Sequence, residues 1–195
     1  MNYFVTGGAG FIGSHIVDEL IRRKQNVVVF DNFSTGKELF IKHHYKNSNF
    51  KLIRGDLLDK DLLTHSLKNI DFVFHFAAHA DVRGGYQNHQ IDHKQNLETT
   101  CLILEAMYKN KVKKIAFAST SSVYGDAKVH PTPENYPFMP TSLYGATKAA
   151  CESYITAYAD YYNWQVYIFR FVSFIGERYT HGIIYDLLKQ IKSKP

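Results

Sequence analysis

The feature that most constrains the fold is a glycine-rich stretch near the start of the chain, YFVTGGAGFIGS at residues 3–14. A short apolar run ends in a cluster of glycines and an amphipathic run follows at once, which is the order of a strand, a tight turn and a helix. Gly7 lets the chain turn, Gly10 lets the backbone approach a ligand closely, and Gly13 lets the helix pack near the strand. Because a helix N-terminus offers free N–H groups and a positive dipole end, the stretch predicts a phosphate-binding turn.

The next apolar run favours a dinucleotide as the ligand. Residues 27–30, Val-Val-Val-Phe, have the composition of a buried strand, and Asp31 follows them. An acid about twenty residues after such glycines lies where a ribose hydroxyl needs an acceptor. A carboxylate there also repels a 2′-phosphate, so the pattern favours NAD over NADP.

Composition limits the remaining classes of protein. The chain has 195 residues, of which 45% are hydrophobic and 21% charged, enough for one globular core. The net charge of +5 comes without a dense Lys/Arg run, so we expect no nucleic-acid partner. No apolar run approaches membrane-spanning length, and the first strand leaves no room for a signal peptide, so we expect a cytoplasmic protein without a membrane partner. Cys101 and Cys151 lack metal-ligand spacing and are expected to be reduced thiols within helices.

Strands and helices alternate along the chain. The hydrophobic pattern predicts strands at residues 2–6, 26–31, 50–54, 71–76, 113–119 and 165–171, and helices at residues 11–24, 59–68, 87–109, 143–162 and 181–192. This alternation predicts a Rossmann-type α/β fold, a doubly wound parallel sheet with helices on both faces. Ligands bind such sheets at the carboxyl ends of the strands. The candidate residues at these ends are Gly7, Asp31, Asp56, Ala77, Thr120 and Ser173.

A tyrosine and a lysine form the candidate catalytic pair. Tyr144 and Lys148 are four residues apart and share one face of a predicted helix. A phenol titrates near about 10, and a nearby ammonium group favours the phenolate, so the pair predicts an activated base. The same spacing also describes a solvated helix face; the dinucleotide turn upstream favours the base.

Hydroxyl groups follow the strand predicted at residues 113–119. Thr120 could hold a substrate oxygen in line with Tyr144. The alternative is a hydroxyl-rich turn that satisfies its own backbone, an interpretation that suits Ser121 and Ser122 better than Thr120.

These motifs together resemble the extended short-chain dehydrogenase/reductase family, in particular its NAD-dependent nucleotide-sugar epimerases and dehydratases, and are most similar to those of UDP-glucose 4-epimerases. The resemblance spans the whole chain. Its motifs are TGGAGFIGSH at residues 6–15, Asp31-Asn32, GDL at 55–57, HFAAHADVR at 75–83, STSSVYGD at 119–126, SLYGATKAA at 142–150 and RFVSFIGERYTHGIIYDLL at 170–188.

The resemblance implies a role for each matching residue. The pyrophosphate would lie on Gly7, Gly10, Phe11 and Ile12, the adenosine ribose on Asp31 and Asn32, adenine on Asp56 and Leu57, and the nicotinamide side on Ala77 and Ala78. Thr120, Tyr144 and Lys148 would form the catalytic triad, with Tyr144 as the base and Lys148 on the nicotinamide ribose. Asn96 and Tyr144 are further expected cofactor contacts.

The resemblance also implies an activity, an epimerisation at C4 of a nucleotide sugar through a transient 4-keto intermediate, carried out by a homodimer with bound NAD. Related dehydratases carry Asp-Glu directly after the threonine, whereas this chain has Ser121-Ser122. Since neither serine is an acid or a base near neutral pH, the epimerase is favoured over a 4,6-dehydratase. A keto-sugar reductase and a non-catalytic NAD-binding protein remain alternatives.

Two departures from the family concern the substrate. Relatives usually have Asn where this chain has Ser173, at a position that binds the sugar-nucleotide diphosphate. Relatives also continue well beyond residue 195, so we expect residues 1–170 to be the NAD-binding domain and residues 171–195 to be the start of a truncated substrate-binding region.

No metal site is expected. His89 and His93 are four residues apart, a spacing that can bind a metal ion, but a solvated helix face explains the pair better. His43 and His44 show no partner pattern.

Overall fold

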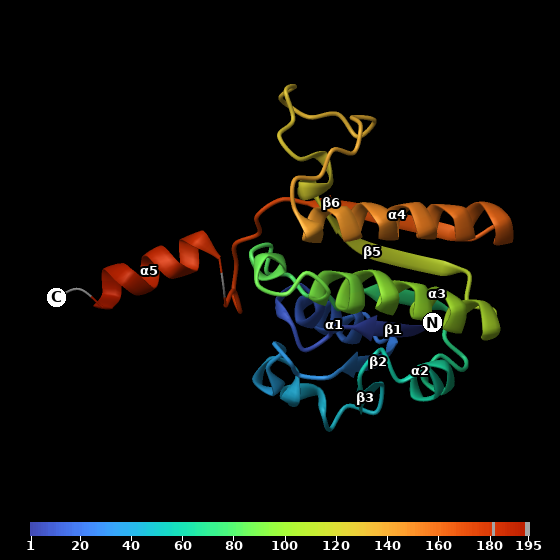
Figure 1. Ribbon diagram of the computed structural model, residues 1–195. Helices are drawn as coiled ribbons and strands as arrows, with labels where there is room; N and C mark the ends of the chain where they lie inside the picture. The colour runs from blue at the N-terminus through green and yellow to red at the C-terminus, as the bar shows by residue number, and fades with distance from the viewer. Residues whose placement is uncertain (181, 194–195) are drawn as a thin grey trace.

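The computed structural model describes residues 1–180 and 182–193, which form one parallel sheet flanked by helices (Figure 1). The described strands are β1 (Asn2–Thr6), β2 (Asn26–Asp31), β3 (Phe50–Arg54), β4 (Phe72–His75), β5 (Lys114–Thr120) and β6 (Gln165–Phe171). They lie in the order β3-β2-β1-β4-β5-β6, and every neighbouring pair is parallel. The predicted doubly wound fold is confirmed.

The order of the strands fixes where a ligand can bind. The chain builds the sheet outward from β1 to β3, then returns to the other side of β1 to build β4, β5 and β6. The connections therefore leave β1 and β4 in opposite directions, which opens a crevice at their carboxyl ends. Thr6, the last residue of β1, pairs with Phe30 on one side and His75 on the other, so the ends of three strands meet there.

Helices cover both faces of the sheet, as alternating side chains of each strand require. On one face, α1 (Phe11–Arg22) packs with Val5, Val29 and Ile41. On the other, α2 (Lys60–Ser66), α3 (Thr99–Lys109) and α4 (Leu143–Tyr162) pack with Phe4, Phe117 and their neighbours. The predicted helix over residues 11–24 thus ends at Arg22, and the one predicted over 59–68 spans Lys60–Ser66.

The helix predicted over residues 87–109 differs most from the structure. A short 3₁₀ turn, Gly84–Tyr86, precedes it, and regular helix starts only at residue 91. A π-helix, His93–Glu98, follows and leads into α3. The wide turns coincide with Asn96, whose side chain bonds to the backbone of His79 instead of facing solvent. Such π-turns are frequent at functional sites.

The last helix, α5 (Ile183–Ser193), stands apart from the sheet at the end of the chain (Figure 1). It corresponds to the helix predicted over residues 181–192, whose first residue, His181, lies outside the described residues. Within residues 1–180 and 182–193, none of the helices combines the length and apolar character that crossing a bilayer requires.

Candidate active site

The glycine turn after β1 is shaped by close backbone contacts. Gly7 has φ of +67°, and a Cβ atom there would lie 2.7 Å from the Ala77 nitrogen. A Cβ atom on Gly13 would lie 2.2 Å from the carbonyl oxygen of Gly7. The Gly10 amide donates to the same oxygen over 3.0 Å. The turn therefore tolerates no side chain at Gly7 or Gly13, and it places the N-terminus of α1 at the crevice between β1 and β4.

A buried network of hydrogen bonds that starts at Thr6, the last residue of β1, lies next to this turn. The Thr6 Oγ1 atom accepts the amides of Phe76 and Ala77 and lies 2.7 Å from His75 Nδ1. The other ring nitrogen, Nε2, lies 3.1 Å from Thr100 Oγ1, which itself donates to the Asn96 carbonyl. Thr100 must therefore accept from His75 Nε2–H, and Thr6 donates to Nδ1. Burial, together with the nearby Lys148 charge, lowers the pKa of His75 to about 3, so the ring is neutral.

The acid predicted to bind ribose lies against the glycine turn. Asp31 is buried and accepts the backbone amides of Ala9 and Phe33, each over 2.8 Å. Burial raises the pKa of this carboxyl, and the two hydrogen bonds lower it in part. The carboxylate thus fixes the glycine turn relative to β2.

A second acid lies beside it at the end of β3. Asp56 accepts the Leu58 amide through one oxygen and the Asn32 side chain through the other, over 2.9 and 3.2 Å. The structure therefore brings Asp31, Asn32 and Asp56 together at the carboxyl ends of β2 and β3, as the strand pattern predicts.

The predicted triad is brought together on the other side of the crevice. Thr120 ends β5, and its side chain lies near enough to Tyr144, at the start of α4, to influence the pKa of the phenol. The Lys148 Nζ atom lies 6.0 Å from the centre of the Tyr144 ring. Thr120 Oγ1 also accepts the Ser122 amide over 3.1 Å, so it caps the following turn as well. The structure therefore supports the capping interpretation for Thr120, and its role in holding a substrate oxygen stays a prediction.

The pKa of Tyr144 beside Lys148 shifts in the direction opposite to the prediction. Burial raises the pKa of Tyr144, the nearby Thr120 hydroxyl lowers it, and the Asp92 charge raises it further, for a net increase. The expected lowering by Lys148 is therefore wrong for the chain without a ligand. The Lys148 ammonium instead donates to the Ala118 carbonyl over 2.9 Å and lies 4.6 Å from the Phe117 ring centre. Burial lowers the pKa of Lys148 to about 8, although nearby acidic groups oppose this.

Sequence reasoning missed a histidine and an acid beside the triad. His79 Nδ1 lies 2.9 Å from Asp92 Oδ1, and Asp92 is fully buried. Asn96 binds both the amide and the carbonyl of His79 through its side chain. Asn96 is an expected cofactor contact. In the structure its side chain fixes the backbone of the segment after β4, on which Ala77 and Ala78 lie.

A second missed network lies on the far side of β5. Glu152 of α4 is buried and binds Arg170 of β6 through both carboxylate oxygens, with the closest contact at 2.8 Å. Ser119 donates to Glu152, and Arg170 donates to the Tyr124 hydroxyl over 2.7 Å. Glu152 raises the pKa of the Arg170 guanidinium above its usual value, chiefly through their hydrogen bonds.

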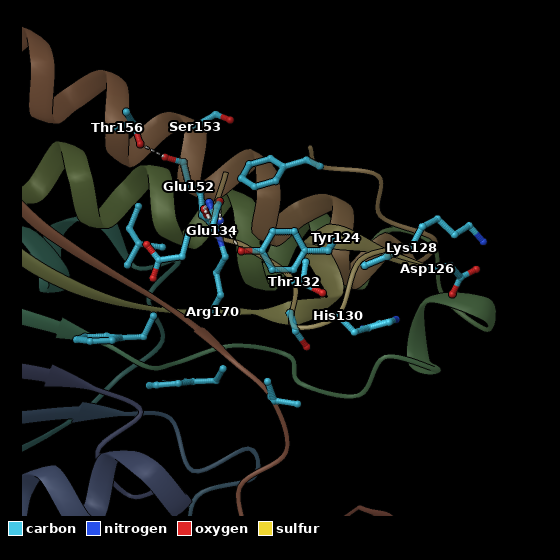
Figure 2. A pocket seen from close by; sticks show the side chains of 18 of the residues that line it. Tyr124, Asp126, Lys128, His130, Thr132, Glu134, Glu152, Ser153, Thr156 and Arg170 are labelled. Carbon is cyan, nitrogen blue, oxygen red and sulfur yellow. Dashed lines mark hydrogen bonds and ion pairs between the residues drawn. The ribbon is translucent and has the colours of Figure 1, made fainter. Parts of the chain in front are cut away.

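This network forms one wall of a wide groove, about 1640 Å³ in volume. Figure 2 shows Glu152 and Arg170 pointing toward Tyr124, with the loop that carries Asp126, Lys128 and His130 on the opposite side. Neither the glycine turn nor Tyr144 lines this groove, so it is separate from the crevice described above. The exposed Ser173 follows β6, at the same end of the sheet as the triad.

The residues of the crevice fit a dinucleotide. The turn at Gly7 and Gly10 leaves room for a pyrophosphate against the N-terminus of α1. Acceptors lie at the ends of β2 and β3 for a ribose and a base. The buried Lys148 and the hydroxyls of Thr120 and Tyr144 lie at the other end, where chemistry on a bound substrate could take place.

Several known proteins are similar to this chain over most of its length. A putative UDP-glucose 4-epimerase of Methanocaldococcus jannaschii is 40% identical over 176 residues, which cover 89% of this chain and 56% of the relative. UDP-glucuronic acid decarboxylase 4 of Arabidopsis thaliana is 36% identical, with 89% of this chain and 39% of the relative covered. The solved structure of UDP-N-acetylglucosamine 4-epimerase from Methanobrevibacter ruminantium M1, in complex with UDP-N-acetylmuramic acid, matches with a TM-score of 0.92 and 35% identity over 98% of this chain and 62% of that one.

The chain therefore spans less than two thirds of the length of these relatives. The family model described as the NAD dependent epimerase/dehydratase family matches residues 3–195. This match, together with the doubly wound sheet and the glycine turn, shows that the chain belongs to the NAD-dependent epimerase/dehydratase family.

Proposed function

We propose that this chain carries the cofactor-binding and catalytic part of a nucleotide-sugar 4-epimerase of the UDP-glucose/UDP-galactose type. The observation that carries the proposal is the placement of Thr120, at the end of β5, and Tyr144 beside a buried lysine, whose Nζ atom lies 6.0 Å from the centre of the Tyr144 ring. A phenol next to an ammonium group can remove a proton from a sugar hydroxyl, and a neighbouring hydroxyl can hold the reacting oxygen.

Each residue of the triad has a separate task in this proposal. Tyr144 takes the proton from the sugar 4-hydroxyl as the C4–H bond breaks, and returns it when the C–H bond forms on the opposite face. Thr120 holds the reacting oxygen, and Lys148 binds the nicotinamide ribose. Bound NAD would supply reversible hydride transfer and a positive charge beside the phenol. That charge favours the phenolate, which burial alone disfavours in Tyr144.

We also propose the roles that the family resemblance implies for the remaining crevice residues. The pyrophosphate would contact the glycine turn, and ribose and adenine would contact the ends of β2 and β3. The fixed segment after β4 would line the nicotinamide. These residues are Gly7, Gly10, Phe11, Ile12, Asp31, Asn32, Asp56, Leu57, Ala77, Ala78 and Asn96.

The choice of an epimerase over a dehydratase depends on Ser121 and Ser122. Both lie in the 3₁₀ turn after β5, and the Ser122 hydroxyl hydrogen-bonds with Thr120 over 3.1 Å. Elimination of water needs an acid and a base at this place, and neither serine can provide one near neutral pH. A dehydratase, a keto-sugar reductase and a non-catalytic NAD-binding protein are the alternatives that the test must separate.

The test is a time course by NMR with this chain, NAD and UDP-galactose. We expect UDP-glucose to accumulate and Tyr144→Phe to reduce its rate by about 10²–10⁴-fold, because the general base is lost. Tyr154→Phe is the matched control, since Tyr154 lies on the same helix with an exposed side chain and its variant should keep the parent rate.

Other outcomes would contradict the proposal in distinct ways. A new methyl signal would indicate a dehydratase, and oxidation or reduction of stoichiometric nicotinamide would indicate a reductase. Binding of NAD without conversion of the sugar would mean that the cofactor half folds alone, and it would favour either the non-catalytic alternative or a substrate site that needs further residues or another sugar. Unchanged turnover in Tyr144→Phe would remove Tyr144 from the mechanism.

We propose residues 1–170 as the NAD-binding domain and residues 171–195 as the start of a substrate-binding region. The proposal is supported by the position of α5 away from the sheet (Figure 1) and by the greater length of the relatives. Limited proteolysis tests it, with first cleavage expected after residue 171.

We also propose a homodimer formed through α3 and α4. Tyr108, Tyr154, Tyr161 and Tyr162 are exposed on these helices, and the rings of Tyr108 and Tyr162 lie 4.7 Å apart. Exposed aromatic side chains of this density are typical of interfaces. Light scattering tests the proposal, and Tyr161→Asp should weaken the association.

A cytoplasmic location is proposed as well. It is supported by Cys101 and Cys151, which are free thiols, as is usual in a reducing compartment.

A further inference from the structure

Two neighbouring histidines face one carboxylate of α1. The His43 Nε2 atom lies 3.0 Å from Asp18 Oδ1, and His44 Nε2 lies 2.6 Å from the same oxygen. Asp18 belongs to α1, whereas both histidines belong to the 3₁₀ helix Lys42–His44 in the segment after β2. The three candidate ligand atoms lie within 4.8 Å of one another. This cluster is independent of the crevice and of its proposed chemistry.

The carboxylate is held so that one oxygen is left to the histidines. Asp18 Oδ2 accepts from the Arg178 guanidinium over 2.6 Å. The carboxylate is therefore oriented by Arg178, and its Oδ1 atom faces the two imidazole nitrogens, at 3.0 Å from His43 and 2.6 Å from His44.

We propose that Asp18, His43 and His44 bind a divalent transition-metal ion such as Zn²⁺. Two imidazole nitrogens and one carboxylate oxygen are a common ligand set for this ion, with a fourth position left to water.

The geometry needs only a small adjustment to accept the ion. Zinc bonded at about 2.0 Å to each ligand in a tetrahedral site keeps the ligand atoms about 3.3 Å apart. The His43–Asp18 contact would therefore open by about 0.3 Å and the His44–Asp18 contact by about 0.7 Å, which side-chain rotation can provide. His44 is the better fixed of the two ligands, since its side chain is 11% exposed and that of His43 is 49% exposed.

Arg178 acts in two ways on such a site. As a partner of the second carboxylate oxygen it orients the ligand, as outer hydrogen bonds do in many metal sites. Its positive charge also opposes the cation, so we expect a dissociation constant in the micromolar range. Bound metal would link α1 to the segment after β2, and through Arg178 to the segment after β6.

The experiment measures Zn²⁺ binding to the tag-free chain by calorimetry, followed by Co²⁺ absorption spectra. We expect one ion per chain, visible bands of a tetrahedral nitrogen/oxygen site with Co²⁺, and a melting temperature raised by about 5–10 °C at a hundredfold excess over the dissociation constant. His43→Ala/His44→Ala should lose the site, and Asp18→Asn should weaken it at least tenfold. The matched control is His89→Ala/His93→Ala, which removes the histidine pair whose spacing alone suggests a metal site.

Two results would overturn the proposal. One is the absence of stoichiometric binding by the parent chain at micromolar metal. The other is equal loss of binding in the control and in the His43/His44 variant, which would indicate scattered surface histidines. If the double alanine variant does not fold, Zn²⁺ binding by His43→Gln and by Asp18→Asn is compared with that of the parent chain and the control instead. Binding of NAD and turnover of the sugar are not needed for any of these readouts, so the proposal stands or fails separately from the proposed function.

Discussion

The region around β1 and α1 and the region around β6 and α5 contain apolar side chains in similar number but differ in what covers them. Phe4, Val5 and Val17 in the first region are completely buried. In the second, Phe169 is 44% exposed and Ile191 is 70% exposed. Since an apolar side chain stabilises a fold only when its surface leaves water, the exposed side chains of the second region stabilise this chain less than the buried ones of the first.

The same contrast applies to the backbone. The glycine turn in the first region has contacts below 3 Å for an added Cβ atom, whereas a Cβ atom on Gly176 in the second would meet Phe11 at 3.6 Å. The backbone therefore leaves no room for a side chain at Gly13 of the glycine turn, whereas it leaves ordinary contact distance at Gly176 after β6. The same substitution should therefore lower the free energy of unfolding more in the first region than in the second.

The largest expected effect is that of a single methyl group on each of two glycines. Gly13→Ala would force a Cβ atom against the Gly7 carbonyl oxygen, and we expect the free energy of unfolding to fall by about 4 kcal/mol or more. Gly176→Ala makes only an ordinary van der Waals contact and should leave it unchanged. Denaturant titration followed by circular dichroism measures both; similar losses in the two variants would contradict the contrast.

The next effect concerns the ion pair that attaches β6 to the core. Glu152→Ala would leave Arg170 partly buried without its carboxylate, and we expect a loss of about 3 kcal/mol in unfolding free energy. Glu105→Ala, at an exposed position of α3, is the matched control and should have little effect. Replacing both members of the pair with Met should recover much of the loss, because no unpaired charge then remains. If Glu152→Ala were as mild as the control, β6 would be no better anchored than α5.

The parts that could be predicted from the sequence are those encoded by local patterns. The strands and the glycine turn follow from apolar runs, glycines and the acid at the end of β2. The position of Thr120 follows because the carboxyl ends of parallel strands meet at one edge of the sheet, and Tyr144 can be predicted from its spacing to Lys148 on one helix face. The π-helix before α3 could not be predicted this way, since Asn96 makes its bonds to His79, on a different segment.

The residues that sequence reasoning missed are pairs on different elements. His79 pairs with Asp92 across 13 positions, Glu152 with Arg170 across 18, and Asp18 with His43 across 25. No periodicity links such positions, because their distance depends on how whole elements pack. The pKa of Tyr144 could not be predicted for the same reason, since burial and Asp92 decide its direction.

The smallest expected effect is the contribution of His75 to the pH dependence of the free energy of unfolding. Its pKa is about 3 in the folded chain, against 6.5 for a free imidazole. Below about pH 6.5 the unfolded chain therefore binds a proton that the folded chain does not, so the free energy of unfolding falls as the pH falls, by up to about 1.4 kcal/mol per pH unit from this residue. His75→Gln removes this contribution, and we expect its stability to depend less steeply on pH between 4 and 6 than that of the parent chain. His89→Gln changes an exposed side chain and should keep the parent slope. Urea titrations at several pH values measure all three slopes. Equal slopes for His75→Gln and the parent would mean that His75 can be protonated in the folded protein. The hydrogen bonds of His75 with Thr6 and Thr100 would then be accessible to water, and the contrast between the two regions would be smaller than proposed.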